Sequence, residues 1–142
     1  MKQLFLTAVA AIVIGASAFA DPTSVNYKVR AHFSADFREA ENVTWKIENN
    51  FAKASFEYND EKMEAFYNND GDLMATSKAF AFNKLPKAAR KTISEKYNGL
   101  EVQECIEMIT ADGEKNYYVS LKKDAQPMVL QVNTFGAVSI FQ

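Results

Sequence analysis

The chain has 142 residues, of which 16 are basic and 18 acidic, so its formal net charge is −2 at pH 7. A mildly acidic chain without a basic cluster offers little to a nucleic acid, and we expect no nucleic-acid partner. The chain has one cysteine and therefore cannot form an internal disulfide. A chain of this length can bury a core without metals or disulfides, and we expect neither a metal nor a cofactor.

Residues 1–20 have the features of a secretory signal peptide: a positive start at Lys2, an apolar run over Leu4–Ala16, and the small-residue motif Ala18-Phe19-Ala20. The run is short for a membrane span, which needs about 20 residues, so a retained anchor is the weaker alternative. We expect cleavage after Ala20. The mature chain then has 15 basic residues against 18 acidic ones, because Lys2 is lost. It is expected in the periplasm or outside the cell, without membrane attachment.

The mature chain begins with a polar leader over residues 21–26. Val29, Phe33 and Phe37 follow at a spacing of four, which predicts a helix over about 27–37. His32 lies beside this stripe and has no second histidine or cysteine at ligand spacing, so we interpret it as a helix-surface residue rather than a metal ligand.

From Val43 onward the apolar period changes to two, which predicts β-strands. Turn signals at Asn49-Asn50, Asn59-Asp60 and Asn69-Asp70-Gly71-Asp72 separate four strands, so we expect an up-and-down meander. Asp-Gly supplies the positive φ angles that a tight turn demands. The oxygen-rich residues 68–72 also suggest calcium, but they lack the spaced acids and the distant glutamate of a calcium loop.

The pattern then starts again. Pro86 opens a second predicted helix over about 86–97, which Asn98-Gly99 ends. Four further strands are predicted at about 102–110, 116–122, 127–133 and 137–141, and residues 79–85 form the linker.

Residues 63–76 align without a gap to residues 128–141 at a spacing of 65, with Gly71 on Gly136. We therefore predict an α+β fold of two tandem α-β-β-β-β units, residues 21–82 and 83–142, which form an antiparallel sheet with the helices packed on one face. Strand positions that are apolar in both copies are assigned to the side under the helices. These are Ala52, Ala54, Phe56, Met63, Ala65, Tyr67, Leu73 and Ala75 in the first unit and Tyr117, Val119, Leu121, Met128, Leu130, Val132, Val138 and Ile140 in the second.

The opposite, helix-free face is expected to meet water, and its large apolar groups rimmed by charges indicate an interaction site. The linker, a loop or a second copy of the chain could instead cover them. The candidate partner-binding residues are Lys53, Glu64, Phe66, Met74, Tyr118 and Phe141.

Cys105 is also placed on the helix-free face, with Gln103 and Glu107. A small buried hydrophobe is the favoured interpretation of this residue. A nucleophile or an intermolecular bridge is the alternative, but the neighbouring Glu104 and Glu107 would raise the thiol pKa.

No nucleophile–base pair, phosphate loop or paired-histidine helix can be recognised, so we expect no enzyme activity. Several structural motifs together resemble the PepSY-like family of exported bacterial proteins, which are abundant in the Bacteroidetes and similar in fold to the beta-lactamase inhibitor protein. The motifs are Asn42-Val43-Thr44-Trp45, Ala54-Ser55-Phe56, Ala65-Phe66-Tyr67, Gly71-Asp72-Leu73-Met74-Ala75-Thr76, Leu85-Pro86 and Ile93 with Tyr97-Asn98-Gly99.

The resemblance covers essentially the whole mature chain and implies a non-enzymatic binding role. The expected partner is a protein or peptide of the cell envelope, held by the helix-free face, and the binding could inhibit a hydrolase or peptidase. A homodimer that buries this face is one alternative. The alternative is a carrier of a small ligand or peptide, which would need a closed pocket between helices and sheet.

Overall fold

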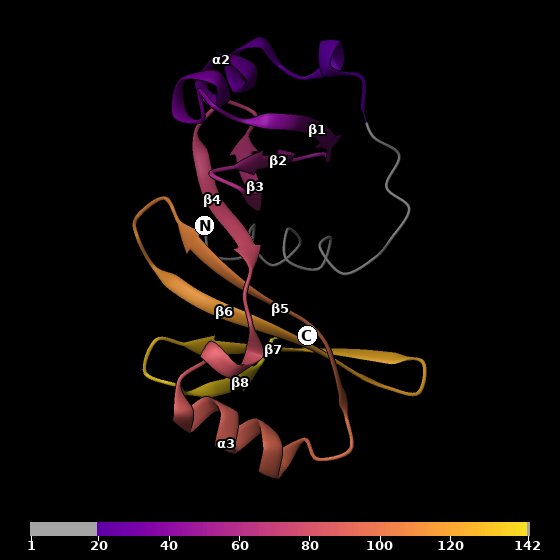
Figure 1. Ribbon diagram of the computed structural model, residues 1–142. Helices are drawn as coiled ribbons and strands as arrows, with labels where there is room; N and C mark the ends of the chain where they lie inside the picture. Colours follow the sequence, from indigo (N-terminus) through magenta and orange to yellow (C-terminus); the bar gives the residue numbers. More distant parts are fainter. Residues whose placement is uncertain (1–19, 142) are drawn as a thin grey trace. The chain divides into compact units, whose positions relative to one another are not determined.

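The computed structural model describes residues 20–141, so the expected signal peptide lies outside the described residues except for Ala20. The chain divides into two compact units between Lys78 and Ala79, slightly before the boundary expected from the sequence. Among residues 20–141 each unit has one α-helix and four strands, which are drawn in Figure 1. No helix within residues 20–141 is long and apolar enough to cross a membrane.

The first unit contains the 3₁₀ turn η1 (Pro22–Ser24), the helix α2 (Tyr27–Asp36) and the strands β1 (Glu41–Ile47), β2 (Phe51–Tyr58), β3 (Glu61–Asn68) and β4 (Leu73–Ala79). Each strand pairs antiparallel with the next one along the chain. Helix α2 begins where Asn26 accepts a hydrogen bond from the Lys28 backbone N–H at 2.9 Å, which satisfies one of the free donors of the first turn.

The second unit contains η2 (Phe82–Lys84), α3 (Lys87–Lys96), β5 (Glu101–Thr110), β6 (Lys115–Lys123), β7 (Gln126–Asn133) and β8 (Val138–Ile140). Its strands form a second antiparallel meander. The predicted linker is more ordered than expected, because it contains η2 and the buried Leu85. The α+β fold of two α-β4 units, each with its helix on one face of an antiparallel sheet, is confirmed.

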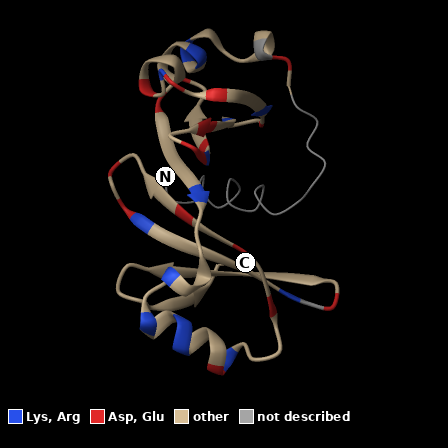
Figure 2. Ribbon diagram, in the orientation of Figure 1, with Lys and Arg blue, Asp and Glu red and all other residues tan. Residues whose placement is uncertain are grey.

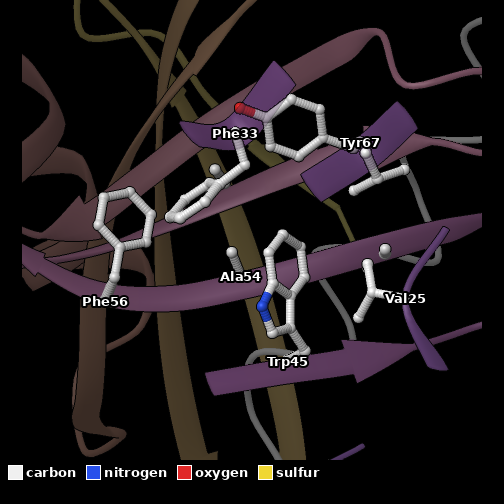
Figure 3. Close-up of a cluster of buried hydrophobic side chains, with 9 residues drawn as sticks. Val25, Phe33, Trp45, Ala54, Phe56 and Tyr67 are labelled. Atoms are coloured by element: carbon white, nitrogen blue, oxygen red, sulfur yellow. The ribbon is translucent and has the colours of Figure 1, made fainter. Parts of the chain in front are cut away.

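An aromatic core joins α2 to its sheet. Phe33 lies at its centre, with ring centroids 5.1 Å from Trp45 and 5.0 Å from Phe56, both edge to face. Figure 3 shows these rings pointing toward one another, with Val25 beside Trp45. Trp45 is 5% exposed, as its alternation with Val43 and Ile47 predicts for a strand residue under the helix. Val25 is 3% exposed and belongs to the same cluster, so the prediction of a polar leader over 21–26 is wrong at this residue.

The core of the second unit is mainly aliphatic. Ala89 and Ile93 of α3 pack on Cys105, Val119 and Leu130. Ala54 and Val119 are equivalent in the 65-residue repeat, and their cross-strand partners are Trp45 and Cys105, respectively. Cys105 therefore occupies the position that the large tryptophan ring holds in the first unit. A gap-free alignment at the repeat spacing of 65 residues misses this match, because Trp45 and Cys105, in the first strands of the two units, are only 60 residues apart.

The repeated glycine turn docks on the helix in both units. In the β3–β4 turn the Gly71 N–H donates to the Asn68 carbonyl at 3.1 Å, and in the β7–β8 turn the Gly136 N–H donates to the Asn133 carbonyl at 3.0 Å. Both glycines have φ near +90°. A Cβ added at Gly136 would lie 3.1 Å from Ala88 Cβ and Pro86 Cβ, and one at Gly71 would lie 3.0 Å from Lys28 Cβ. The repeat therefore preserves a close contact between turn and helix.

Three β-bulges shift the alternation of side chains and overturn part of the predicted face assignment. Ala75 pairs with Phe66 across the irregular β3–β4 ladder, so Ala75 lies on the helix-free face rather than under α2. Cys105 lies under α3, not on the helix-free face, because the β5 register shifts between Val102 and Glu104. A bulge adds one residue to one strand only, and every later side chain then changes face.

Ile140 and Glu107 also differ from expectation. Ile140 pairs with the core residue Leu130 but is 63% exposed, because it ends the short edge strand. Glu107 pairs in register with Tyr117, two residues from Cys105, so it lies on the α3 side; it is 8% exposed and forms an ion pair with Lys115 at 3.4 Å.

Candidate functional site

The candidate binding residues fall into two groups, one on the helix-free face of each sheet. Lys53, Glu64, Phe66 and Met74 belong to the first unit, on β2, β3 and β4. Tyr118 lies on β6 and Phe141 directly follows β8, in the second unit. We describe each group within its own unit.

Lys53 and Glu64 form the polar centre of the first group. The Lys53 ammonium donates to the Glu64 carboxylate at 2.7 Å. Ser55 and Ser77, which flank Glu64 across the strands, each place a hydroxyl 3.3 Å from that carboxylate. The prediction that Lys53 forms an exposed rim is wrong, since it is only 7% exposed. A buried lysine needs a partner, and the cross-strand glutamate provides one.

Phe66 is 1% exposed, so the prediction that it faces water is wrong. Its cross-strand neighbours are Lys53 and Ala75, and its ring centroid lies 6.1 Å from that of Phe51. Phe51 opens β2 immediately after the predicted Asn49-Asn50 turn, outside the alternation that defined the face. Met74 is half-buried at the β4 bulge. The first group is thus a packed cluster rather than an exposed one.

Tyr118 and Phe141 form an aromatic pair on the helix-free face of the second unit. Their ring centroids are 5.0 Å apart at an interplanar angle of 74°, the edge-to-face arrangement that aromatic rings favour. The Phe141 N–H donates to the Val129 carbonyl at 2.8 Å and fixes the residue beside β7. Both side chains remain partly exposed. Burial is the main reason that the pKa of Tyr118 is raised, and the negative charge of Glu114 contributes to the same shift. The phenol is therefore neutral at pH 7.

Ser120 lies on the same helix-free face, beside Val129 in the register. It is 4% exposed, and its Oγ has no hydrogen-bond partner among residues 20–141. Ser120 and Val129 are the repeat equivalents of Ser55 and Glu64, at the same 65-residue spacing. The second unit has therefore exchanged the carboxylate that satisfies Ser55 for an apolar side chain. Aligning the two repeats in the sequence could have identified Ser120 as a serine that lacks the glutamate partner of Ser55. A serine in a strand does not by itself indicate an unpaired hydroxyl.

Helix α3, on the other side of this sheet, carries four basic residues, Lys87, Arg90, Lys91 and Lys96. Figure 2 shows these residues as blue segments along α3, and α3 packs against the face that carries Cys105 and Val119. The aromatic pair therefore lies on the face away from this basic helix. A partner that covers the pair has apolar groups to contact.

Neither residue considered for chemistry has an environment that activates it. Burial, together with the charge of Glu104, raises the pKa of the Cys105 thiol to about 12, so the thiol is protonated at neutral pH. The His32 Nδ1–H donates to the Gly71 carbonyl, which gives His32 a structural contact between α2 and the β3–β4 turn. Within the described residues no group of three or more histidine, cysteine or acidic side chains could hold a metal ion.

A carrier would need space between helix and sheet, and in each unit packed side chains fill that layer. An open cleft of about 540 Å³ lies instead at one end of the first unit, between the α2–β1 connection and the β2–β3 turn. Its lining is polar and largely acidic: Arg38, Glu39, Ala40, Glu41, Glu57, Tyr58, Asn59 and Asp60.

No protein-family model matches the chain, and no curated protein matches it. Solved structures do match. A BLIP-like protein of Bacteroides fragilis superposes with a TM-score of 0.65 at 12% identity, and the match covers 92% of this chain and 88% of that protein. The chain has a BLIP-like fold.

Two further Bacteroides proteins share this fold. A DUF2874 family protein of Bacteroides uniformis superposes with a TM-score of 0.70 at 14% identity, covering 79% of this chain and 84% of its own. A protein of Bacteroides eggerthii that is predicted to be periplasmic gives 0.71 at 12% identity, with 80% and 85% covered. These identities establish a common fold and no shared activity.

Proposed function

We propose that this chain is an exported, non-enzymatic protein that binds a protein or peptide partner through the helix-free face of its second sheet. The observation that carries the proposal is the partly exposed Tyr118–Phe141 pair, on the side of the sheet that α3 does not cover. Aromatic side chains at the centre of an interface commonly dominate its binding energy.

Export and binding have independent support. The charged start, apolar run and Ala18-Phe19-Ala20 motif favour a mature chain that begins at Asp21, in the periplasm or outside the cell. The PepSY-like resemblance of the sequence favours restraint of a hydrolase or peptidase as the outcome of binding. The intact mass of the natively exported protein tests export, and a mass that retains residues 1–20 would contradict it.

The binding test is capture of partners from a cell-envelope extract by the exported protein. A stoichiometric protein partner is expected, with capture weakened at least about 30-fold by Tyr118→Ala and by Phe141→Ala, the usual loss at an aromatic anchor. Phe135→Ala is the matched control, because Phe135 is an aromatic residue of the same unit that is 89% exposed in a turn outside the pair.

Capture that survives both anchor substitutions would place the binding site elsewhere. Turnover of a substrate by the pure exported protein would contradict the non-enzymatic part of the proposal. Sedimentation of the wild-type chain measures whether it is a monomer or a dimer. A dimer would indicate that the aromatic pair is buried between two copies of the chain rather than against a different partner.

A further inference from the structure

We propose that the outer edge of β1 is a second binding surface, which takes an extended polypeptide segment as an added antiparallel strand. One backbone contact of this kind is present in the structure. The Ala20 N–H donates to the Trp45 carbonyl at 2.8 Å, and the two residues form an antiparallel bridge. This edge is separate from the helix-free face, so the inference rests on the proposed export but not on the proposed binding through Tyr118 and Phe141.

The hydrogen-bond pattern of β1 shows which backbone groups are available at this edge. The Glu48 N–H donates to the Phe51 carbonyl of β2 at 2.8 Å. Hydrogen-bonded and non-hydrogen-bonded pairs alternate in an antiparallel ladder, so Lys46 also bonds toward β2, while Trp45 and Ile47 direct their N–H and C=O groups away from it. The β1 bulge between Glu41 and Thr44 ends the regular ladder. The usable edge is therefore residues 45–47.

The side chains along this edge favour an apolar segment. Ile47 is 43% exposed, and it lies on the same side of β1 as the buried Trp45. Natural edge strands are usually protected by charges, prolines or bulges, whereas here an isoleucine is exposed at an edge that, within residues 20–141, is paired only through Ala20. In an antiparallel strand that places a small residue at the Ala20 position, the residue two places earlier pairs with Ile47 and can cover it.

The contact at Ala20 ends abruptly at the next residue. The Asp21 carbonyl accepts hydrogen bonds from the Ser24 N–H at 2.9 Å and from the Ser24 hydroxyl at 2.6 Å. This turn redirects the chain into the core at Val25. The predicted cleavage after Ala20 falls between the edge contact and the turn. Processing would thus remove the residue that occupies the edge, retain the turn, and free the edge for another strand.

The test uses the natively exported protein and a synthetic peptide, IGASAFA, which has the sequence of residues 14–20. Trp45 is the chain's one tryptophan, so its fluorescence should change saturably as the peptide fills the edge. Amide hydrogen exchange at Ile47 should slow by about tenfold or more, as expected for an amide that gains a hydrogen bond. Ile140, in the edge strand β8 of the other unit, is the control amide and should not change.

A peptide with proline in place of its last alanine should bind at least about tenfold more weakly, because proline has no N–H to donate to the Trp45 carbonyl. In the full-length chain the Ile47 amide should exchange slowly without added peptide, and Ala20→Pro should make it faster. Equal binding of the proline peptide, slowing at Ile140 instead of Ile47, or no binding at all would overturn the inference. Exchange at Ile47 that is equally slow in the exported and full-length chains would also overturn it. None of these outcomes affects the test of Tyr118 and Phe141.

Discussion

Replacing Gly136 with alanine tests whether the repeated glycine turn is held against the helix. Gly136 and Gly113 both have φ of +89° and both lie in hairpin turns of the second unit. An alanine at either position is strained by about 1–2 kcal/mol, because its Cβ crowds the backbone at positive φ. For Gly113 that strain is the whole expected effect, since an added Cβ meets nothing within 4 Å.

At Gly136 the added Cβ also meets the start of α3. It would lie 3.1 Å from Ala88 Cβ and Pro86 Cβ and 3.2 Å from the Ala89 nitrogen, whereas carbon atoms in contact prefer about 3.5–4.0 Å. Because these neighbours belong to the helix and its cap, the turn and α3 must separate by several tenths of an ångström. Overpacking of this kind costs about 1–3 kcal/mol. We therefore expect a loss in unfolding free energy of about 2–5 kcal/mol for Gly136→Ala and about 1–2 kcal/mol for Gly113→Ala.

The assay is urea unfolding followed by far-ultraviolet circular dichroism, with the slope on denaturant compared between variants to verify that the transitions are equivalent. Trp45 fluorescence is unsuitable as the only signal, because Trp45 lies in the other unit. Equal losses for the two variants would refute the close contact between turn and helix as the reason for the repeated glycine.

Three further outcomes follow from the two cores. Trp45→Ala should lower the unfolding free energy by about 3–5 kcal/mol, while Tyr27→Ala, at a tyrosine that is 76% exposed, should change it by less than about 0.5 kcal/mol; a loss below about 1 kcal/mol for Trp45→Ala would contradict its burial. Tyr67→Phe removes the hydroxyl that donates to the Asp36 carboxylate at 2.8 Å and should cost about 1–2 kcal/mol, and an unchanged midpoint in urea would show that this bond adds nothing. The pKa of the Cys105 thiol is raised to about 12 in the folded chain, whereas an unfolded thiol ionises near pH 8.5, so stability should fall as the pH rises from about 8.5 toward 12. Cys105→Ala should remove the part of this decrease between about pH 8.5 and 10, below the range in which unfolded tyrosines ionise, and an identical pH profile in that variant would contradict the assignment.

Periodicity predicted the elements of this fold well, because each element has an apolar pattern of its own. The i, i+4, i+8 stripe of Val29, Phe33 and Phe37 predicted a helix over about 27–37, and the structure has one at Tyr27–Asp36. The β2–β3 turn at Asn59-Asp60 has positive φ at both residues, as tight hairpins need. The fold class required only these local signals and the internal repeat.

The faces of the strands were harder to predict, because a single bulge changes every later side chain. Ala75 and Cys105 were each assigned to the wrong side by assuming unbroken alternation. Asn42, with φ of +53°, lies at the β1 bulge, and asparagine is among the few residues that adopt this conformation readily. No comparable signal in residue type marks the β4 or β5 bulge.

The candidate site was predicted correctly where the strands are regular and incorrectly where burial depends on contacts between strands. Tyr118 and Phe141 were correctly placed on one helix-free face, since β6 is regular and Phe141 continues the ladder to Val129. Phe66 and Lys53 share the predicted side but are buried. Their burial depends on partners, Phe51 and Glu64, whose contacts arise only when the strands are in register.

The most direct test of the proposed function is the affinity between the exported protein and a purified partner captured from the cell envelope, measured by calorimetry for four proteins. The wild type and Phe135→Ala are expected to bind equally. Tyr118→Ala and Phe141→Ala are each expected to bind at least about 30-fold more weakly, a loss of roughly 2 kcal/mol, with unfolding transitions that show both variants folded. Affinities of folded Tyr118→Ala and Phe141→Ala that equal the wild-type value would contradict the account.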